Sequence, residues 1–167
     1  MWSKIQTMME GHPERLRVVR ILLENGLGLR GNEVYLNDIE VPVVRIAKSA
    51  GVDRRTVDET IKMVETIPEL KSLFSNLRSA GLSLRGVARQ LGLGVVEITV
   101  EDPHKSGIIA DAAQIFSELG ISIRQALVDD PELAPEPKLV LIGDKAVPGE
   151  IIPRLLKIQG VTRVSVY

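Results

Sequence analysis

The stretch Ile46-Ala-Lys-Ser-Ala-Gly-Val-Asp-Arg-Arg-Thr-Val-Asp-Glu-Thr-Ile61 has the pattern of two short helices joined by a glycine turn. Ala47 is small enough for two helices to cross closely, and Gly51 stands four residues later, where such a turn needs a positive φ. Asp53 can then cap the second helix. The apolar side chains expected to be buried between the two helices are Ile46, Ala50, Val52 and Val57. The stretch therefore predicts a helix-turn-helix over about residues 42 to 66.

This spacing resembles the helix-turn-helix of lac-repressor type proteins and of many other bacterial and archaeal regulators, in which the second helix enters the major groove. The resemblance implies duplex DNA as a partner, contacted by Arg54, Arg55, Thr56 and Lys62. Thr60 departs from the pattern, because a bulky apolar residue is usual there, and Ile61 is expected to take over its packing. Asp58 and Glu59 lie on the same helix and would repel phosphates. A packing hairpin or a protein-contact surface therefore stays open as the alternative.

Composition limits the possible classes of protein. The chain has 167 residues and no cysteine, which allows two small domains and excludes a disulfide framework and thiolate chemistry. We find no export sequence and no apolar run of the roughly 20 residues that span a bilayer, so a cytoplasmic, soluble protein is expected. Residues 1–92 carry 14 Lys and Arg against 11 Asp and Glu, whereas residues 93–167 carry 7 against 11. The sign of this difference suits a first half that faces nucleic acid.

The hydrophobic period changes near residue 93, which predicts a helical domain over residues 1–92 and a second domain over residues 93–167. In the first domain we expect helices from Pro13 to Gly26, from Pro68 to Gly81 and, shorter, from Ser83 to Leu91, and a hairpin over Asn32 to Val41 that turns at Asn37-Asp38.

The second half alternates strands and helices in the order βαββαβ. The expected strands are residues 95–100, with Glu97 and Thr99 on the polar side, 121–128, 139–142 and 161–167, and the expected helices are residues 106–119 and 148–160. This order predicts an antiparallel sheet with both helices on one face, the ferredoxin-like plan. The fold class is therefore α+β, a helical domain followed by a ferredoxin-like domain.

Residues 95–167, with the first loop reading Val100-Glu-Asp-Pro-His-Lys-Ser-Gly-Ile108, look like an ACT domain, a small module that senses amino acids. The resemblance implies an amino acid effector at that loop. A helix amino terminus offers unpaired N–H groups to a carboxylate, Gly107 lets the backbone approach closely, and Asp102 could hold the α-ammonium group. The residues that the resemblance assigns to the effector are Asp102, His104, Lys105, Ser106, Gly107, Ile108 and Ser122.

Each of these residues also has an ordinary structural interpretation. Asp102 can close a strand, Ser106 can cap a helix, and His104 can be an exposed loop side chain. Two isolated histidines without a carboxylate cluster do not form a metal site, and we find neither a phosphate loop nor a nucleophile motif. A non-enzymatic protein without a cofactor is therefore expected.

As a whole, the chain resembles a set of predicted archaeal regulators of amino acid metabolism that join a helix-turn-helix to an ACT domain. The resemblance implies a ligand-gated transcription regulator that dimerises through its ACT domains. The last strand carries Val164 and Val166 on an unprotected edge, which also favours a homodimer with sheets side by side. The competing interpretation is a regulatory subunit that senses an amino acid and docks on a biosynthetic enzyme. An ACT-like module that has lost its ligand and only dimerises also stays open.

Overall fold

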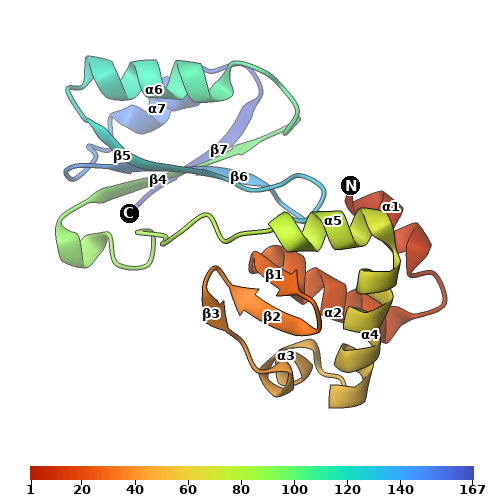
Figure 1. Ribbon diagram of the computed structural model, residues 1–167. Coiled ribbons are helices and arrows are strands. Elements are labelled where there is room, and N and C mark those ends of the chain that lie inside the picture. The colour runs from red at the N-terminus through yellow and green to blue at the C-terminus, as the bar shows by residue number, and fades with distance from the viewer. The chain divides into compact units, whose positions relative to one another are not determined.

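The computed structural model describes all 167 residues and divides into two units, Met1–Gly81 and Leu82–Tyr167 (Figure 1). Residues 82 to 92 belong to the second unit, whereas the change of hydrophobic period had placed them in the first. They belong there because Ala88 and Leu93 pack with Val95 on the second unit's sheet.

The first unit combines five helices with a small antiparallel sheet (Figure 1). Its helices are α1 (Trp2–Met8), α2 (Pro13–Glu24), α3 (Val43–Ala50), α4 (Arg54–Thr66) and α5 (Pro68–Asn76). Its strands are β1 (Leu27–Arg30), β2 (Glu33–Leu36) and β3 (Ile39–Glu40), in the order β1-β2-β3. The expected hairpin turn is confirmed, with Asn37 at φ 55°.

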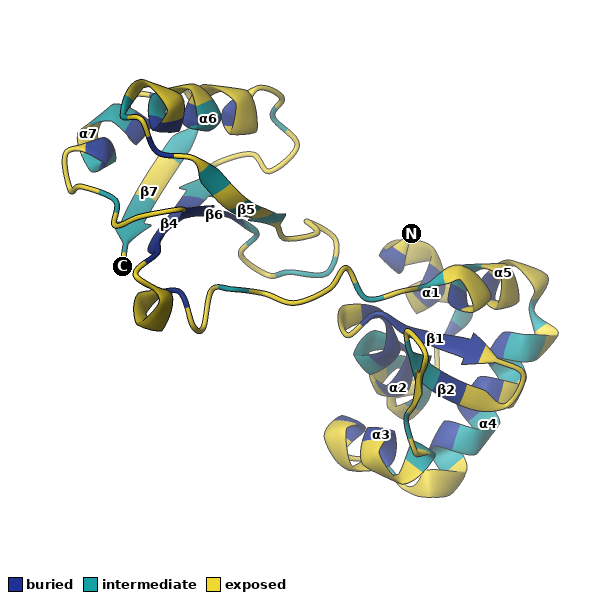
Figure 2. Cartoon of the chain, turned by 60° about the vertical axis from the view of Figure 1, so that its left-hand side comes forward, coloured by how far each residue is buried: buried dark blue, intermediate teal, exposed yellow.

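Two features of this unit differ from the sequence-based expectation. Strand β1 was not predicted, because its four residues include a glycine and carry little strand propensity of their own; packing of α5 against β1 decides its conformation. Helix α5 ends at Asn76 rather than near Gly81, since Leu77 is already extended at φ −65° and ψ 134°. Helices α2, α3 and α4 pack against one another, and their buried sides face the interior of the unit (Figure 2).

The second unit has the predicted order βαββαβ. Its elements are β4 (Gly94–Val100), α6 (Ile108–Glu118), β5 (Ile123–Val128), β6 (Lys138–Gly143), α7 (Ile151–Leu155) and β7 (Val161–Val166). The strands form one antiparallel sheet in the order β5-β6-β4-β7, which confirms the ferredoxin-like plan and leaves β5 and β7 as its edges. Helix α7 is shorter than expected, because irregular turns replace it after Leu155.

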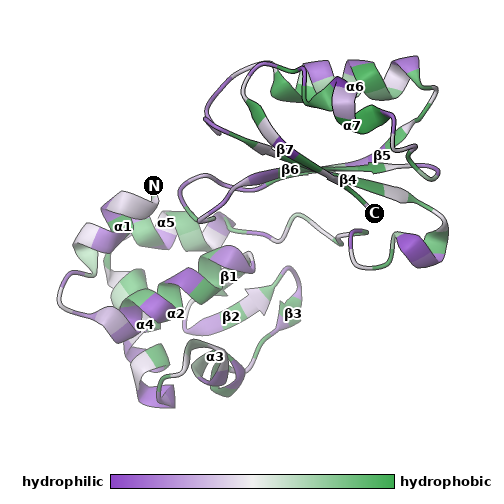
Figure 3. Ribbon diagram, turned by 180° about the vertical axis from the view of Figure 1, so that it is seen from behind, coloured by the Kyte–Doolittle hydropathy of each residue, from purple (hydrophilic) through white to green (hydrophobic).

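The two faces of this sheet are covered differently. Helices α6 and α7 cover one face, where Ile98, Phe116 and Leu155 are fully buried. The segment 82–93 runs over the other face, and Figure 3 shows the two layers on opposite sides of the sheet. The expected helix from Ser83 is wrong: the segment contains turns and a single 3-10 turn, η1 (Arg89–Leu91). Its start is held extended by hydrogen bonds to a side chain of β5 rather than by helical bonds.

The expected polar side of β4 is also wrong at one position. Glu97 is only 7% exposed, because the segment 82–93 covers it. Alternation along a strand assigns residues to a face but does not show what covers that face. No helix in the chain combines the length and the apolar character needed to span a bilayer.

Candidate functional sites

The turn between α3 and α4 has the predicted geometry. Gly51 ends α3 in the left-handed conformation, with φ 63° and ψ 41°. Asp53 caps α4, since its Oδ1 accepts a hydrogen bond of 2.6 Å from the Arg55 backbone N–H. Ile46, Ala50 and Val57 are buried as expected, whereas Val52 is only half-buried. Ala47, the small residue at the helix crossing, is also buried. These contacts fix α4 firmly relative to α3.

Arg17, on α2, holds the same turn from outside. Its Nε donates to the Ala50 carbonyl at 3.1 Å, and its Nη2 donates to the Gly51 carbonyl at 3.4 Å. A cation at a helix carboxyl terminus also interacts favourably with the helix dipole. Sequence reasoning missed this residue, because it lies 33 positions before its first acceptor and no local motif connects them.

Thr60 fits the packing although its residue type departs from the usual pattern. Its side chain is fully buried, and its hydroxyl donates to the Thr56 carbonyl at 2.6 Å. This bond satisfies the hydroxyl inside the helix, so the residue packs without an unpaired polar group. Ile61 is buried beside it, so both residues contribute to the core.

The exposed start of α4 carries arginines that are already ion-paired. The Arg54 and Arg55 side chains are 72% and 86% exposed, and they lie 3.6 Å from Asp58 and 3.0 Å from Glu59, respectively. Glu59 also binds Arg15 of α2 at 3.2 Å. The hydrogen bond from Arg55, joined by that from Arg15, lowers the pKa of the Glu59 carboxyl against the opposing effect of desolvation.

The other two residues assigned to DNA lie on the same helix. Lys62 is exposed and Thr56 is half-buried. The four residues therefore share α4, and cations and carboxylates alternate along it. A phosphate must compete with these carboxylates for each guanidinium group.

In the second unit, the loop before α6 forms a tight turn. Gly107 precedes the helix with φ 94°, which favours glycine. Asp102 shapes the turn: its carbonyl accepts from the Lys105 N–H at 3.1 Å, and its Oδ1 accepts from the His104 N–H at 2.9 Å. Ser106 does not cap α6, because Gly107 occupies the N-cap position.

A cavity of about 500 Å³ lies beside this turn, between the first half of α6, the end of β5 and the start of β6. Four of the residues assigned to the effector line it: Lys105, Ser106, Gly107 and Ile108. Asp102 and His104 do not line the cavity. Ser122 lies at the opposite end of β5, where its N–H donates to Asp144 Oδ1 at 3.1 Å.

The rest of the cavity wall comes from parts of the chain that sequence reasoning had not connected with the turn. Ile109, Ala110 and Ala113 add apolar surface from α6, and Val128, Asp129, Pro131, Pro137, Lys138 and Leu139 come from the β5–β6 connection and its flanking strand ends. Asp129 supplies a carboxylate to this wall, whereas the Lys138 ammonium group lies 3.6 Å from Glu97 Oε2, on the sheet face opposite α6. The connection between β5 and β6 thus contributes to the wall of the cavity.

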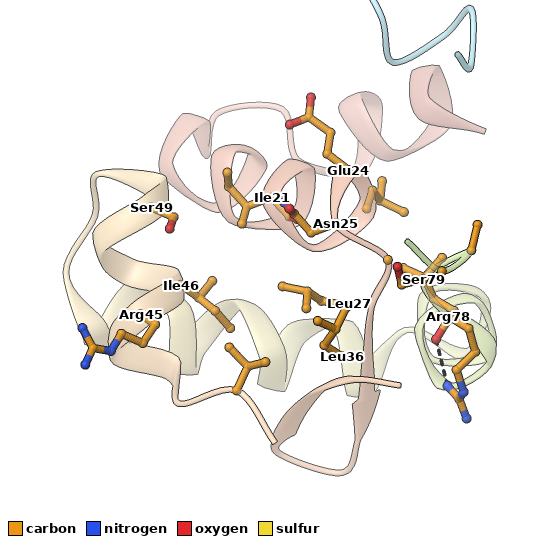
Figure 4. Close-up of a pocket in the computed structure, with 16 residues that line it drawn as sticks. Ile21, Glu24, Asn25, Leu27, Leu36, Arg45, Ile46, Ser49, Arg78 and Ser79 are labelled. Atoms are coloured by element: carbon orange, nitrogen blue, oxygen red, sulfur yellow. Dashed lines mark hydrogen bonds between the residues drawn. The ribbon is translucent and has the colours of Figure 1, made fainter. Parts of the chain in front are cut away.

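A second cavity, of about 850 Å³, lies within the first unit (Figure 4). Leu27, Leu36 and Ile46 give it an apolar wall, and Arg45 and Arg78 stand at its two sides and point away from each other. Its polar groups therefore do not converge on one position, and the cavity defines no class of ligand. The chain contains no group of His, Cys, Asp or Glu side chains arranged to hold a metal ion.

No protein-family model and no curated protein matches the chain. Among solved structures, it is similar to the leucine response regulatory protein of Mycobacterium tuberculosis, with 19% identity, a TM-score of 0.29 and coverage of 93% of this chain and 90% of that chain. An AsnC family transcriptional regulator from Agrobacterium tumefaciens has 15% identity, a TM-score of 0.28 and coverage of 92% and 86%. A transcriptional regulator of Neisseria meningitidis in complex with L-Met has 14% identity, a TM-score of 0.27 and coverage of 92% and 86%. These distant neighbours are transcriptional regulators, but the likeness is too weak to define the function of this chain.

Proposed function

We propose that the chain is an amino-acid-responsive regulator that binds duplex DNA through α4 and a small amino acid in the cavity beside α6. One observation carries this proposal: a capped, exposed second helix in one unit is joined to a unit with a cavity at a helix amino terminus. The first is the geometry of a DNA-reading helix, and the second suits a carboxylate. The proposed DNA contacts are Arg54, Arg55, Thr56 and Lys62.

The cavity supports an amino acid better than a larger or neutral ligand. The first N–H groups of α6 and the Lys105 side chain can bind a carboxylate. Asp129 lies on the far wall, and its Oδ1 can bind the α-ammonium group while its Oδ2 accepts from the Lys138 N–H at 3.1 Å. Asp102 is less suited to this role because it does not line the cavity. The apolar wall, which includes Ile109 and Val128, suits an aliphatic side chain.

Dimerisation is part of the proposal, because two reading helices must lie about 34 Å apart to meet successive major grooves. Both edges of the second unit's sheet are unpaired within the chain. Strand β5 is the edge that borders the cavity, and Val128 at its end is 61% exposed. A homodimer with sheets side by side would pair such an edge and bring an effector close to the interface.

The alternative function is a regulatory subunit that senses an amino acid and docks on a biosynthetic enzyme through its first unit. The pairing of Arg54 and Arg55 with Asp58 and Glu59 favours it, because paired arginines bind phosphate less readily. Under this alternative, α4 contacts protein and the chain has no steep salt-dependent affinity for DNA.

Binding to random-sequence duplex DNA over a range of salt concentrations separates the two functions. Phosphate contacts predict that the logarithm of affinity falls linearly with the logarithm of salt concentration, with a slope of about −0.9 for each phosphate neutralised. Affinity that is absent at low salt, or that does not change with salt, would favour the regulatory subunit. Sedimentation at micromolar concentration tests the homodimer, which a monomer would contradict.

A thermal-shift screen of the twenty amino acids tests the effector. A ligand present at 100 times its Kd stabilises the folded state by about 2.7 kcal/mol. The expected hit is a small aliphatic amino acid, and the corresponding amine without a carboxylate should give no shift. If the amine stabilises the protein equally well, the proposed role of the α6 amino terminus is wrong.

A further inference from the structure

A polar hollow of about 220 Å³ lies on the face of the second unit's sheet that is opposite α6 and α7. It is built on the three neighbouring strands β6, β4 and β7. Its lining residues are Glu97, Thr99, Lys138, Arg163, Ser165 and Tyr167, and each side chain carries a charge or a hydroxyl group. The part of the same face that the segment 82–93 covers is instead mainly apolar. The hollow is therefore a chemically distinct part of this face.

The strand register places one cation on each side of Thr99. Thr99 of β4 is paired with Lys138 of β6 and, on its other side, with Arg163 of β7. Directly opposed residues of neighbouring strands have Cβ atoms about 5 Å apart, so both long side chains can reach over Thr99. The sheet therefore fixes the spacing of an ammonium group and a guanidinium group above one hydroxyl group.

A carboxylate of the β5–β6 connection bridges these two cations. Arg163 Nη2 donates to Glu136 Oε1 at 2.7 Å, and the Lys138 ammonium group lies 3.8 Å from Glu136 Oε2. The Glu136 side chain is 55% exposed, and exposed ion pairs contribute little stability. The two cations are thus spaced to hold an oxyanion between them, and another anion can displace the carboxylate that lies there.

The hollow also contains hydrogen-bond donors that have no acceptor in the chain. The Lys138 ammonium group lies 3.6 Å from Glu97 and 3.8 Å from Glu136, whereas a charge-assisted hydrogen bond measures about 2.9 Å. Its side chain is only 25% exposed. The three hydroxyl groups of the lining donate to no group of the protein. An oxyanion in the hollow would accept from donors that the fold itself does not use.

The balance of charge around the hollow also favours an anion. Glu97 is buried and bound by Arg85, which compensates its charge from the side of the segment 82–93. Lys138 and Arg163 then have only the exposed Glu136 as a further carboxylate partner. An anion that replaces Glu136 therefore meets a net positive environment.

We propose that this hollow binds the phosphate group of a small molecule between Lys138 and Arg163, and that Glu136 competes for the same place. A phosphate monoester carries a charge of about −1.5 to −2 at neutral pH and three strong acceptor oxygens, more than a carboxylate offers. It can accept from the guanidinium, ammonium and Thr99 hydroxyl groups at once. The sheet separates this site from the cavity beside α6, so the proposal does not depend on the amino acid effector.

Titration of the full chain with inorganic phosphate, at constant ionic strength and followed by amide chemical shifts, tests the site. Phosphate should shift the amides of Thr99, Lys138 and Arg163. Arg163→Gln should weaken binding about tenfold, because it removes a charge-assisted hydrogen bond. Lys157→Gln removes the same charge from an exposed position of the same unit, outside the hollow. If the two variants lose affinity equally, phosphate responds only to net charge and the proposed site is wrong.

Glu136→Gln tests the competition. It should bind phosphate about fivefold more tightly than wild type, because it frees both cations from their shared carboxylate. Glu150→Gln is the matched control, with the same change of charge at an exposed position without an ion pair. An equal gain in Glu150→Gln would exclude competition by Glu136. If neither wild type nor Glu136→Gln binds phosphate at millimolar concentration, the proposal is overturned.

The same titration with glycerol phosphate distinguishes the source of the phosphate group. Tyr167 lines the hollow and is 69% exposed, so its ring can contact the organic part of a monoester. We therefore expect glycerol phosphate to bind more tightly than inorganic phosphate, and Tyr167→Ala to remove this difference. Tighter binding of inorganic phosphate would exclude a phosphorylated small molecule as the ligand.

Discussion

The two candidate binding regions differ in how their cations are compensated. On α4, Arg54 and Arg55 each have a carboxylate of the same helix within 4.0 Å. Beside α6, Lys105 has no carboxylate within that distance, and the first N–H groups of the helix have no helical partner. An anion at α6 therefore displaces mainly water, whereas a phosphate at α4 must also displace carboxylates.

This difference predicts two kinds of affinity in one chain. Exposed ion pairs contribute little stability, so a polyanion such as DNA can break them, but each broken pair reduces the net gain. Binding of DNA should therefore be modest and strongly dependent on salt. Binding in the cavity should depend less on salt, because apolar walls exclude part of the solvent.

Filling the cavity should give the largest effect. Ala110 lines the cavity on the exposed side of α6, and Ala110→Trp would place an indole ring in it. Because the ring and the effector would occupy the same space, we expect affinity for the amino acid to fall at least about 100-fold, or about 2.7 kcal/mol. Calorimetric titration measures this, with Ala146→Trp as an exposed control outside the cavity. An effector that binds Ala110→Trp normally must occupy another site.

Removal of the paired arginines should have the next largest effect. The double variant Arg54→Ala/Arg55→Ala should bind duplex DNA about tenfold more weakly at low salt, and its salt dependence should be shallower by about two. The double variant Arg124→Ala/Lys157→Ala removes the same charge from the second unit and should keep the wild-type slope. Equal slopes for the two variants would show that α4 does not meet phosphates.

The glycine turn and the helix cap of the helix-turn-helix could be predicted from the sequence, because each depends on residues a few positions apart. Gly51 and Asp53 have the expected conformation and cap. Arg17 could not be predicted, since its contact with the same turn depends on how α2 packs against α3. Thr60 was recognised as a departure from the pattern, but its hydrogen bond to Thr56 explains why the departure is tolerated.

In the second unit, hydrophobic periodicity predicted the order of the helices and strands, but not the contacts between residues that are far apart in the sequence. The segment 82–93 was predicted to contain a helix because its apolar residues recur with a helical period. In the structure, the Gln125 side chain, 41 positions after Leu84, holds the start of this segment extended. Glu97 was predicted to be exposed because alternation along β4 does not show that the segment 82–93 covers that residue. The cavity includes the predicted turn, but Asp129 and Lys138 reach it only through the fold of the sheet.

The variant Gly51→Ala changes the conformation of the turn before α4 and leaves the charges on α4 unchanged. A Cβ atom at Gly51 would meet nothing within 4 Å, so the cost comes only from its φ of 63°. We expect the first unit to lose about 1 kcal/mol of unfolding free energy in urea. The comparison is Gly86→Ala, which has an equally open site and no positive φ, and which should leave the first unit unchanged. A loss well above this value would mean that the turn has a further constraint.

Glu59→Gln should have the smallest effect, and it tests the compensation of charge on α4 directly. It frees Arg55 and Arg15 from their shared carboxylate, so affinity for DNA at low salt should rise about threefold. Glu10→Gln makes the same change of charge at an exposed position without an ion pair and controls for the overall field of the unit. If both variants bind DNA equally well, only net charge matters and the pairing on α4 has no role.

The difference in stability between wild type and Glu59→Gln should depend on pH in a defined direction. Because Arg55, and then Arg15, lower the pKa of the folded-state Glu59 carboxyl, its ion pairs stabilise the fold above the pKa of the unfolded chain. This contribution is lost as the pH falls through the lower, folded-state pKa. Wild type should therefore be more stable than Glu59→Gln at neutral pH, and the difference should shrink below about pH 4.3, where an unperturbed glutamate takes up its proton. Urea unfolding at a series of pH values measures this difference, and a gap that widens in acid would show that Glu59 is not stabilised by the two arginines.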